Sequence, residues 1–290
     1  MNTQREGFTL VELLVVAVLA VLLMGAAYQS LMVQERSSRA AGQMVRGQDA
    51  LRVALGVLEA ELREVVTHND ATGGTDLLVA TRDSVVIRAQ RKLGLVCRRH
   101  PSDRQLEIIS EGENGAFQVD DYVLVFADGD PTTAADDAWF AARVHGTASP
   151  SATCDFLPDA PAANQRLNLQ RPDGTSLDGT RLNDVLLGAP IRGLERVTYG
   201  LYEADDGGWH MGRRRHGTNE LERLVDGLAG PGSGLVFTYL DGNGNALAQP
   251  ISHAAMQGIV SVRIEAATDP HPGTGAPATE LTTHIHLRNN

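Results

Sequence analysis

Gly7-Phe8-Thr9-Leu10-Val11-Glu12 leads into a long apolar segment, and this stretch decides how the rest of the chain is organised. From Leu13 to Gln34 there are 22 consecutive uncharged residues, rich in leucine, valine and alanine. A helix needs about 20 such residues to cross the hydrocarbon core of a bilayer. We therefore expect a membrane-spanning helix near residues 10 to 32.

Glu12 is the anomaly in this segment, because a carboxylate inside a spanning helix costs roughly 2.5 to 3.5 kcal/mol. A partner of opposite charge would offset that cost. Cleavage between Gly7 and Phe8 would place a new α-amino group four residues before Glu12, about one helical turn away. The amine of a neighbouring copy could then neutralise the carboxylate of Glu12.

The order of glycine, aromatic, hydroxyl residue, two aliphatics, glutamate and apolar run resembles the processing signal of type IV pilins and type II secretion pseudopilins. The resemblance implies that prepilin peptidase cuts after Gly7 and that the new N-terminal residue, Phe8, is N-methylated. It also implies that Glu12 pairs with the N-terminus of an adjacent subunit during filament assembly.

Three other interpretations compete with this resemblance. A secretory signal would use Arg5 and a cleavage zone at residues 25–27, but a glutamate in the apolar region and the length of the run count against it. A simple uncleaved anchor leaves Glu12 unexplained. A buried core helix would be apolar on one side only, whereas this segment is apolar all round.

Composition narrows the functional classes. A chain of 290 residues allows one or two domains, and its net charge of −11 argues against a general nucleic-acid binder. Cys97 and Cys154 lie in what would be the exported part, where an oxidising compartment permits a disulfide between them. Two unrelated free thiols are the alternative.

The helical pattern continues beyond the apolar segment. Leucines and other residues recur in steps of three and four, which predicts one helix from about Phe8 to Val66. The stripe could form a coiled coil or pack on the chain's own sheet; we favour the sheet, because the stripe covers only about three heptads and the resemblance implies a half-buried helix. Glycines at four positions are expected to permit bending. The stripe comprises Met44, Gln48, Leu51, Leu55, Leu58, Leu62 and Val65, and the glycines are Gly25, Gly42, Gly47 and Gly56.

Strong turn formers at residues 68–74 end the helix, and a period of two then predicts strands. The region 147–184 holds four prolines and is expected to be a long surface excursion. Candidate strands are residues 77–80, 84–89, 105–109, 122–126, 139–144, 196–202, 209–211, 234–240, 258–264 and 281–289.

The C-terminal third resembles the PilW-like minor pilins and the J-type minor pseudopilin. The resemblance rests on a hairpin, the basic stretch Arg213-Arg214-Arg215, an aromatic strand ending in Tyr239-Leu240-Asp241-Gly242, and a terminal Leu-Arg-Asn. It leaves residues 90–185 uncovered.

No catalytic, cofactor or metal site is predicted. The chain has no GxSxG, HExxH or P-loop motif. His284 and His286 share one strand face without a third ligand, so we interpret them as surface residues. The loop starting at Asp241 lacks the glycine and glutamate of a calcium loop, having Ala246 and Ser252 there, and is expected to be a turn.

Two charged clusters are also interpreted without a ligand. The carboxylates of Asp128, Asp130, Asp136 and Asp137 suit a solvated loop. Arg213 to Arg215 suit salt bridges or a local interface.

The expected fold is α+β and pilin-like: a long N-terminal helix followed by an antiparallel β-rich head. We expect a leader at residues 1–7, a transmembrane half-helix at 8–34, an amphipathic half-helix at 35–67 and a head at 68–290. The implied function is a low-copy, non-enzymatic minor pilin, held once through the inner membrane with its head in the periplasm. Its expected partners are prepilin peptidase and other pilin subunits, with no cofactor and no nucleic acid. Alternatives are a minor pseudopilin and a membrane-anchored periplasmic enzyme or binding protein.

Overall fold

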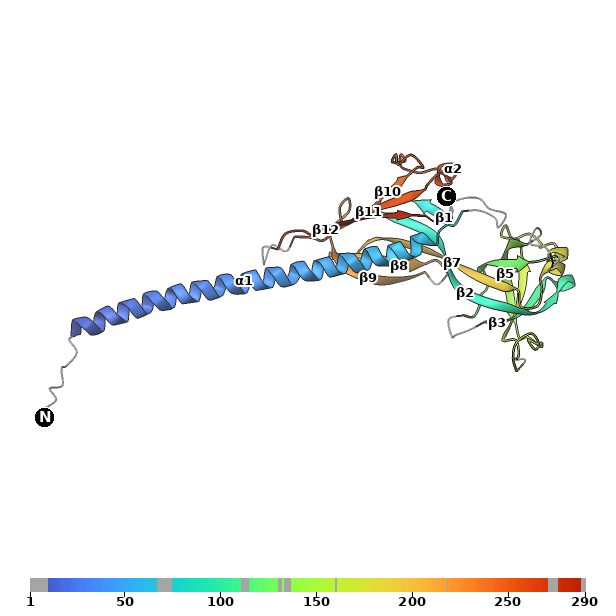
Figure 1. Cartoon of the computed structure of the whole chain (residues 1–290), viewed down its shortest axis with the longest axis horizontal. Helices are drawn as coiled ribbons and strands as arrows, with labels where there is room; N and C mark the ends of the chain where they lie inside the picture. The colour runs from blue at the N-terminus through green and yellow to red at the C-terminus, as the bar shows by residue number, and fades with distance from the viewer. Residues whose placement is uncertain are drawn as a thin grey trace.

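The computed structural model describes residues 10–66, 75–110, 115–129, 132, 137–159, 161–217, 219–270 and 276–287. A single long helix, α1 (Leu10–Arg63), leads into a β-rich head (Figure 1). All strand pairs in the head are antiparallel. The expected α+β, pilin-like architecture is therefore confirmed.

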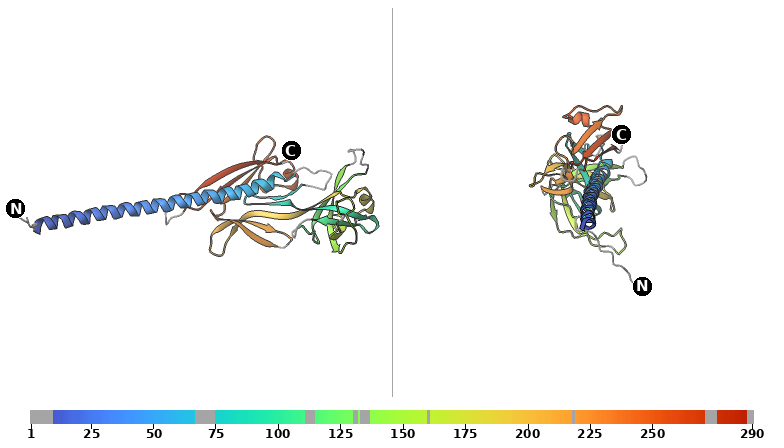
Figure 2. Two further views of the ribbon diagram at one scale, coloured as in Figure 1. Left: turned by 60° about the horizontal axis from the view of Figure 1, so that its bottom comes forward. Right: turned by 90° about the vertical axis from the view of Figure 1, so that its left-hand side faces the viewer.

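Helix α1 is continuous over 54 residues, and none of the four glycines interrupts it. Its first half projects beyond the head, and its second half packs against the head (Figures 1 and 2). Leu51, Leu55, Leu58 and Leu62 are buried there, as the stripe predicted, but Met44 is 40% exposed. Gln48 is half-buried, and full burial of the stripe begins at Leu51, two turns after Met44.

The helix covers one face of two sheets. Among the described residues, the larger sheet has nine strands and the smaller has three, in the order β10-β11-β12. Helix α1 contacts β9, β11 and β12, and its leucines share a core with Val197, Tyr199 and Ile264. The strands are β1 (Leu77–Ala80), β2 (Ser84–His100), β3 (Gln105–Ser110), β4 (Tyr122–Ala127), β5 (Ala138–Ala148), β6 (Gln165–Gln170), β7 (Pro190–Glu203), β8 (Trp209–Arg215), β9 (Glu220–Leu228), β10 (Leu235–Leu240), β11 (Ser261–Ala267) and β12 (Glu280–His286). The short helices are η1 (Pro101–Asp103), η2 (Gly179–Asp184) and α2 (His253–Met256).

Part of the larger sheet closes on itself. The pairings run β2-β3-β6-β5-β4-β7 and return to β2, because Gly94 and Leu95 pair with β3 on one side and with β7 on the other. The interior is filled by a second core, which includes Phe117, Val125 and Leu167. We call this ring the barrel lobe. It lies at the end of the head farthest from the apolar end of α1 (Figure 1).

Strands β2 and β7 belong to both parts of the head. Ser84 to Gln90 of β2 pair with β7 beneath α1, and Lys92 to Leu95 pair with β7 in the barrel lobe. The register shifts between Gln90 and Lys92, which leaves Arg91 as the extra residue of a bulge. The guanidinium of Arg91 donates to both carboxylate oxygens of Glu61 on α1 at 2.7 Å. This ion pair ties the bulge to the helix.

Two expectations from the sequence were wrong. The region 147–184 is not only a surface excursion: it contributes β6 and η2, and Leu167, Leu169 and Leu182 are buried in the barrel lobe. The strand expected at 84–89 runs on to His100, because the bulge at Arg91 lets it continue through a polar stretch.

The burial of α1 can be tested with one substitution. Leu58 is fully buried, so Leu58→Ala should lower the free energy of unfolding of the head by about 2 to 5 kcal/mol. Val53 is 56% exposed on the same helix, and Val53→Ala should change it by no more than about 0.5 kcal/mol. Urea unfolding in mild detergent, followed by tryptophan fluorescence, measures both values. Equal effects of the two substitutions would contradict the packing of α1 on the head.

Candidate processing and assembly site

The apolar half of α1 has no protein cover. Side chains on all sides of the helix are exposed, including Leu13, Val16, Leu19, Leu22 and Val33. The most apolar stretch has a mean hydropathy of 2.7, and none of it is buried. The structure thus excludes the buried core helix. A helix that is apolar all round needs an apolar surrounding, which lipid or neighbouring helices provide.

Glu12 lies in the first turn of α1, where the helix N-terminus favours a negative charge. Its side chain is on the exposed apolar surface. Gly7 and Phe8 lie outside the described residues.

Residues 2–28 match the family model described as the prokaryotic N-terminal methylation motif. The chain carries the signature of type IV pilins and pseudopilins. This pilin signature ends at Tyr28, within the projecting half of α1. No curated protein and no solved structure matches the chain.

The residues considered for other chemistry are dispersed. His284 and His286 are exposed on β12, opposite Arg263 and Ser261. Asp241 accepts hydrogen bonds from the backbone N–H groups of Asn243 and Asn245 at 2.9 and 2.8 Å, which uses its carboxylate within the turn. Among the described residues no group of three potential metal ligands comes together. Asp130 and Asp136 lie outside these residues.

The three consecutive arginines of β8 do not form one patch. Arg213 pairs with Glu222 at 2.5 Å, whereas Arg214 lies over the ring of Tyr202, with its Cζ atom 5.4 Å from the centroid. Successive side chains of a strand point to opposite faces. Arg213 and Arg214 consequently serve different sides of the sheet.

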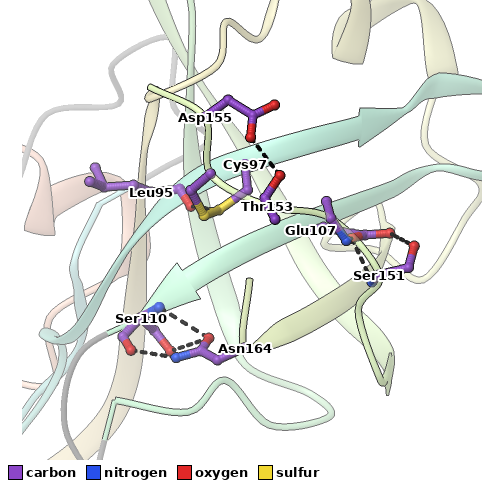
Figure 3. The surroundings of a disulfide bond; sticks show 10 residues. Leu95, Cys97, Glu107, Ser110, Ser151, Thr153, Asp155 and Asn164 are labelled. Atoms are coloured by element: carbon purple, nitrogen blue, oxygen red, sulfur yellow. Dashed lines mark hydrogen bonds between the residues drawn. A yellow bond between two sulfur atoms is a disulfide. The ribbon is translucent and has the colours of Figure 1, made fainter. Parts of the chain in front are cut away.

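Cys97 and Cys154 form a disulfide in the structure, with their Cα atoms 4.5 Å apart (Figure 3). Cys97 is on β2, and Cys154 is on the segment between β5 and β6. Both side chains are buried in a small cluster with Ala163. The bond fastens this segment to the wall of the barrel lobe.

Glu107 also holds the segment between β5 and β6 on the barrel lobe, and the sequence did not predict this role. Its carboxylate is fully buried and accepts hydrogen bonds from the backbone N–H groups of Ser151 and Ala152 at 2.9 and 2.6 Å. Arg166 donates to it at 2.5 Å, and the ring of His100 lies 3.0 Å away. A charged residue within the strand pattern of β3 is the only signal that the sequence offers.

The pKa of Glu107 reflects these contacts. Burial alone raises the pKa, but the hydrogen bonds from Ser151, Ala152, His100 and Arg166 outweigh burial and lower the pKa from 4.5 to about 2. Glu107 is therefore ionised in the folded protein at any pH well above 2. At the other end of the segment Asn164 donates to the carbonyl of Ser110 at 2.6 Å, so both ends are held (Figure 3).

This lowered pKa predicts a pH-dependent stability. A depressed pKa stabilises the fold above the unfolded value near 4.5, and that stability is lost as the pH falls toward 2. The shift corresponds to about 3 kcal/mol. Glu107→Gln should lower the free energy of unfolding at pH 7 by about 2 to 3 kcal/mol and remove this part of the acid sensitivity.

The measurement is urea unfolding at pH values from 7 to 2, with Asp159→Asn as the control. Asp159 is an exposed carboxylate in the same segment, so its loss should leave the pH dependence unchanged. An unaltered acid sensitivity in Glu107→Gln would refute the role of this carboxylate.

Proposed function

We propose that the protein is a low-copy, pilin-like subunit that prepilin peptidase processes after Gly7 and that takes part in the assembly, initiation or tip of a type IV pilus. The match to the N-terminal methylation motif carries this proposal. The exposed apolar half of α1 supports it, because the same apolar surface can lie in lipid or against the apolar helices of neighbouring subunits.

Each segment has a role in this proposal. Residues 1–7 are a leader that is removed, residues 8–34 span the inner membrane once, and residues 35–67 join the membrane to the head. Residues 68–290 form the head, which lies in the periplasm until the subunit enters a filament. The partners are the peptidase, the inner membrane and other pilin subunits, and the role is structural rather than enzymatic.

Glu12 supplies the contact that favours the assembled filament over the single subunit in the membrane. In lipid its charge is costly, so an amine from the N-terminal Phe8 of a neighbouring subunit lowers the free energy of the assembled state. The same pairing fixes the axial position of one helix relative to the next. Each residue advances a helix by about 1.5 Å, so a shift of a few residues would separate the amine from the carboxylate.

The barrel lobe supports a low-copy position. It extends the head beyond the end of α1, on the side away from the apolar segment (Figure 2). A repeating shaft subunit must leave that space for the next copy along the axis. A subunit at the end of a filament has no such restriction.

The pilin signature is shared by pseudopilins, so a minor pseudopilin of a type II secretion system is the second candidate. Both candidates use the same processing and the same helix. The neighbouring genes discriminate between the two candidates. A pilus operon would indicate a pilin, and a secretion operon would indicate a pseudopilin. A membrane-anchored periplasmic enzyme or binding protein, whose N-terminus only resembles that of a pilin, is the third candidate, and cleavage near Ala27 or no cleavage would favour it.

The mature N-terminus tests the processing step. Mass spectrometry of the purified protein should find Phe8 as the first residue, carrying one methyl group. An N-terminus near Ala27, or an intact Met1, would overturn the proposal in favour of a secretory signal or an uncleaved anchor.

The pairing role of Glu12 has its own test. Glu12→Ala should leave cleavage after Gly7 largely intact but reduce incorporation into filaments at least tenfold, because the amine of the adjacent subunit loses its partner. Glu35→Ala is the control, since Glu35 pairs with Arg39 within the same helix. Immunoblots of sheared filaments and of membranes measure both variants, and normal incorporation of Glu12→Ala would refute the pairing.

A further inference from the structure

The outer face of β7 carries an unusual set of side chains. Ile191, Val197 and Tyr199 point into the two cores, so the alternate residues point away from α1. Among these, Arg192 and Arg196 are exposed. Side chains from the neighbouring strands lie beside them. We call this surface the β7 outer face, and it comprises Arg88 of β2, Tyr122 of β4, Trp139 of β5, Arg192, Arg196 and Tyr202 of β7, and Arg214 of β8.

Three of its arginines lie over aromatic rings. The Cζ atom of Arg88 is 4.2 Å from the ring centroid of Tyr122, and that of Arg192 is 4.4 Å from the ring centroid of Trp139. Arg214 lies 5.4 Å from the ring centroid of Tyr202. A ring beneath a guanidinium restricts its motion and leaves its N–H groups available, so less conformational entropy is lost when an anion binds.

The positive charge of this face is not neutralised internally. Within the part of the chain that the structure describes, Arg88, Arg192, Arg196 and Arg214 form no ion pair with a carboxylate. Arg88 and Arg196 are even direct cross-strand partners, an arrangement in which like charges repel. The repulsion would be relieved by an anionic partner.

The pKa of His216 reflects the positive electrostatic potential of this face. It lies next to this face, where its ring contacts the hydroxyl of Thr198 at 2.7 Å. Burial lowers its pKa, and the charges of Arg196 and Arg214 lower it further. A cationic surface thus exists on a chain whose net charge is −11.

We propose that the β7 outer face is a docking surface for an acidic protein partner, whose carboxylates bind the ring-supported arginines. Arginine, tryptophan and tyrosine are the residues that contribute most binding energy in protein interfaces. The guanidinium fork matches a carboxylate in two hydrogen bonds. At Tyr122, Trp139 and Arg192 the face lies on the outer wall of the barrel lobe, which is convex and suits a broad protein surface better than a small ligand.

A nucleic acid fits this face less well. The rings are already covered by guanidinium groups, so they are not open to stacking by bases. The face is also independent of α1, because it points to the opposite side of the sheet. Contacts made through the helix therefore leave it accessible, and binding can be measured in the isolated chain.

The test uses the full chain in neutral detergent micelles and a fluorescein-labelled random copolymer of glutamate and tyrosine as the probe. Fluorescence anisotropy measures binding to the wild type and to Arg88→Gln/Arg192→Gln. We expect the double variant to bind at least tenfold more weakly. The matched control is Arg52→Gln/Arg63→Gln, which removes the same charge from exposed positions of α1 and should change binding less than twofold.

Arg196→Gln is a second variant that does not disturb a ring contact, and it should weaken binding at least threefold. The proposal would be overturned if the wild type, Arg88→Gln/Arg192→Gln and Arg196→Gln bound the probe equally. It would also be overturned if Arg52→Gln/Arg63→Gln lost as much binding, because that would indicate a general effect of net charge. Oligothymidylate of matched charge is measured in parallel. Tighter binding of oligothymidylate through the same arginines would replace the protein partner by a nucleic acid.

Discussion

The pairing of β2 with β7 is the constraint on which the rest of the head depends. These two strands pair from Ser84 opposite Gly200 to Leu95 opposite Pro190. One half of the pair lies under the leucine stripe of α1, and the other half closes the barrel lobe. Neither core could form in its present place if the register of this pair slipped, because a slip of one residue exchanges the buried and exposed side chains.

Much of the outline could be predicted from the sequence, because its signals are local. The long uncharged run predicts a spanning helix. Apolar residues recur with a period of 3.6 in α1 and of 2 in the strands, which separates the helix from the strands near both ends of the head. The middle of the chain was harder. Prolines and glycines between residues 147 and 184 suggested loops, although the alternation of Leu167 and Leu169 marks a strand that closes the barrel lobe. Closure of a ring depends on partners distant in the sequence, which no local pattern encodes.

The two contacts that hold the segment between β5 and β6, the disulfide and Glu107, also differ in how well the sequence predicts them. Two cysteines can be paired by counting, but the role of Glu107 depends on backbone groups of Ser151 and Ala152 more than forty residues away. The arginines of the β7 outer face likewise come from three different strands, so only the fold brings them together. At the N-terminus the opposite holds, since the N-terminal methylation motif matches the contiguous residues 2–28.

The shared strands also give the molecule a mechanical character. Strands β2 and β7 run lengthwise between α1 and the barrel lobe (Figure 1), and the bulge at Arg91 is fixed to Glu61 where they pass from one to the other. A pull between the apolar end of α1 and the far end of the head would load their hydrogen bonds together, in shear, and not one after another. The fold thus places its longest ladder of hydrogen bonds along the line that joins α1 to the barrel lobe.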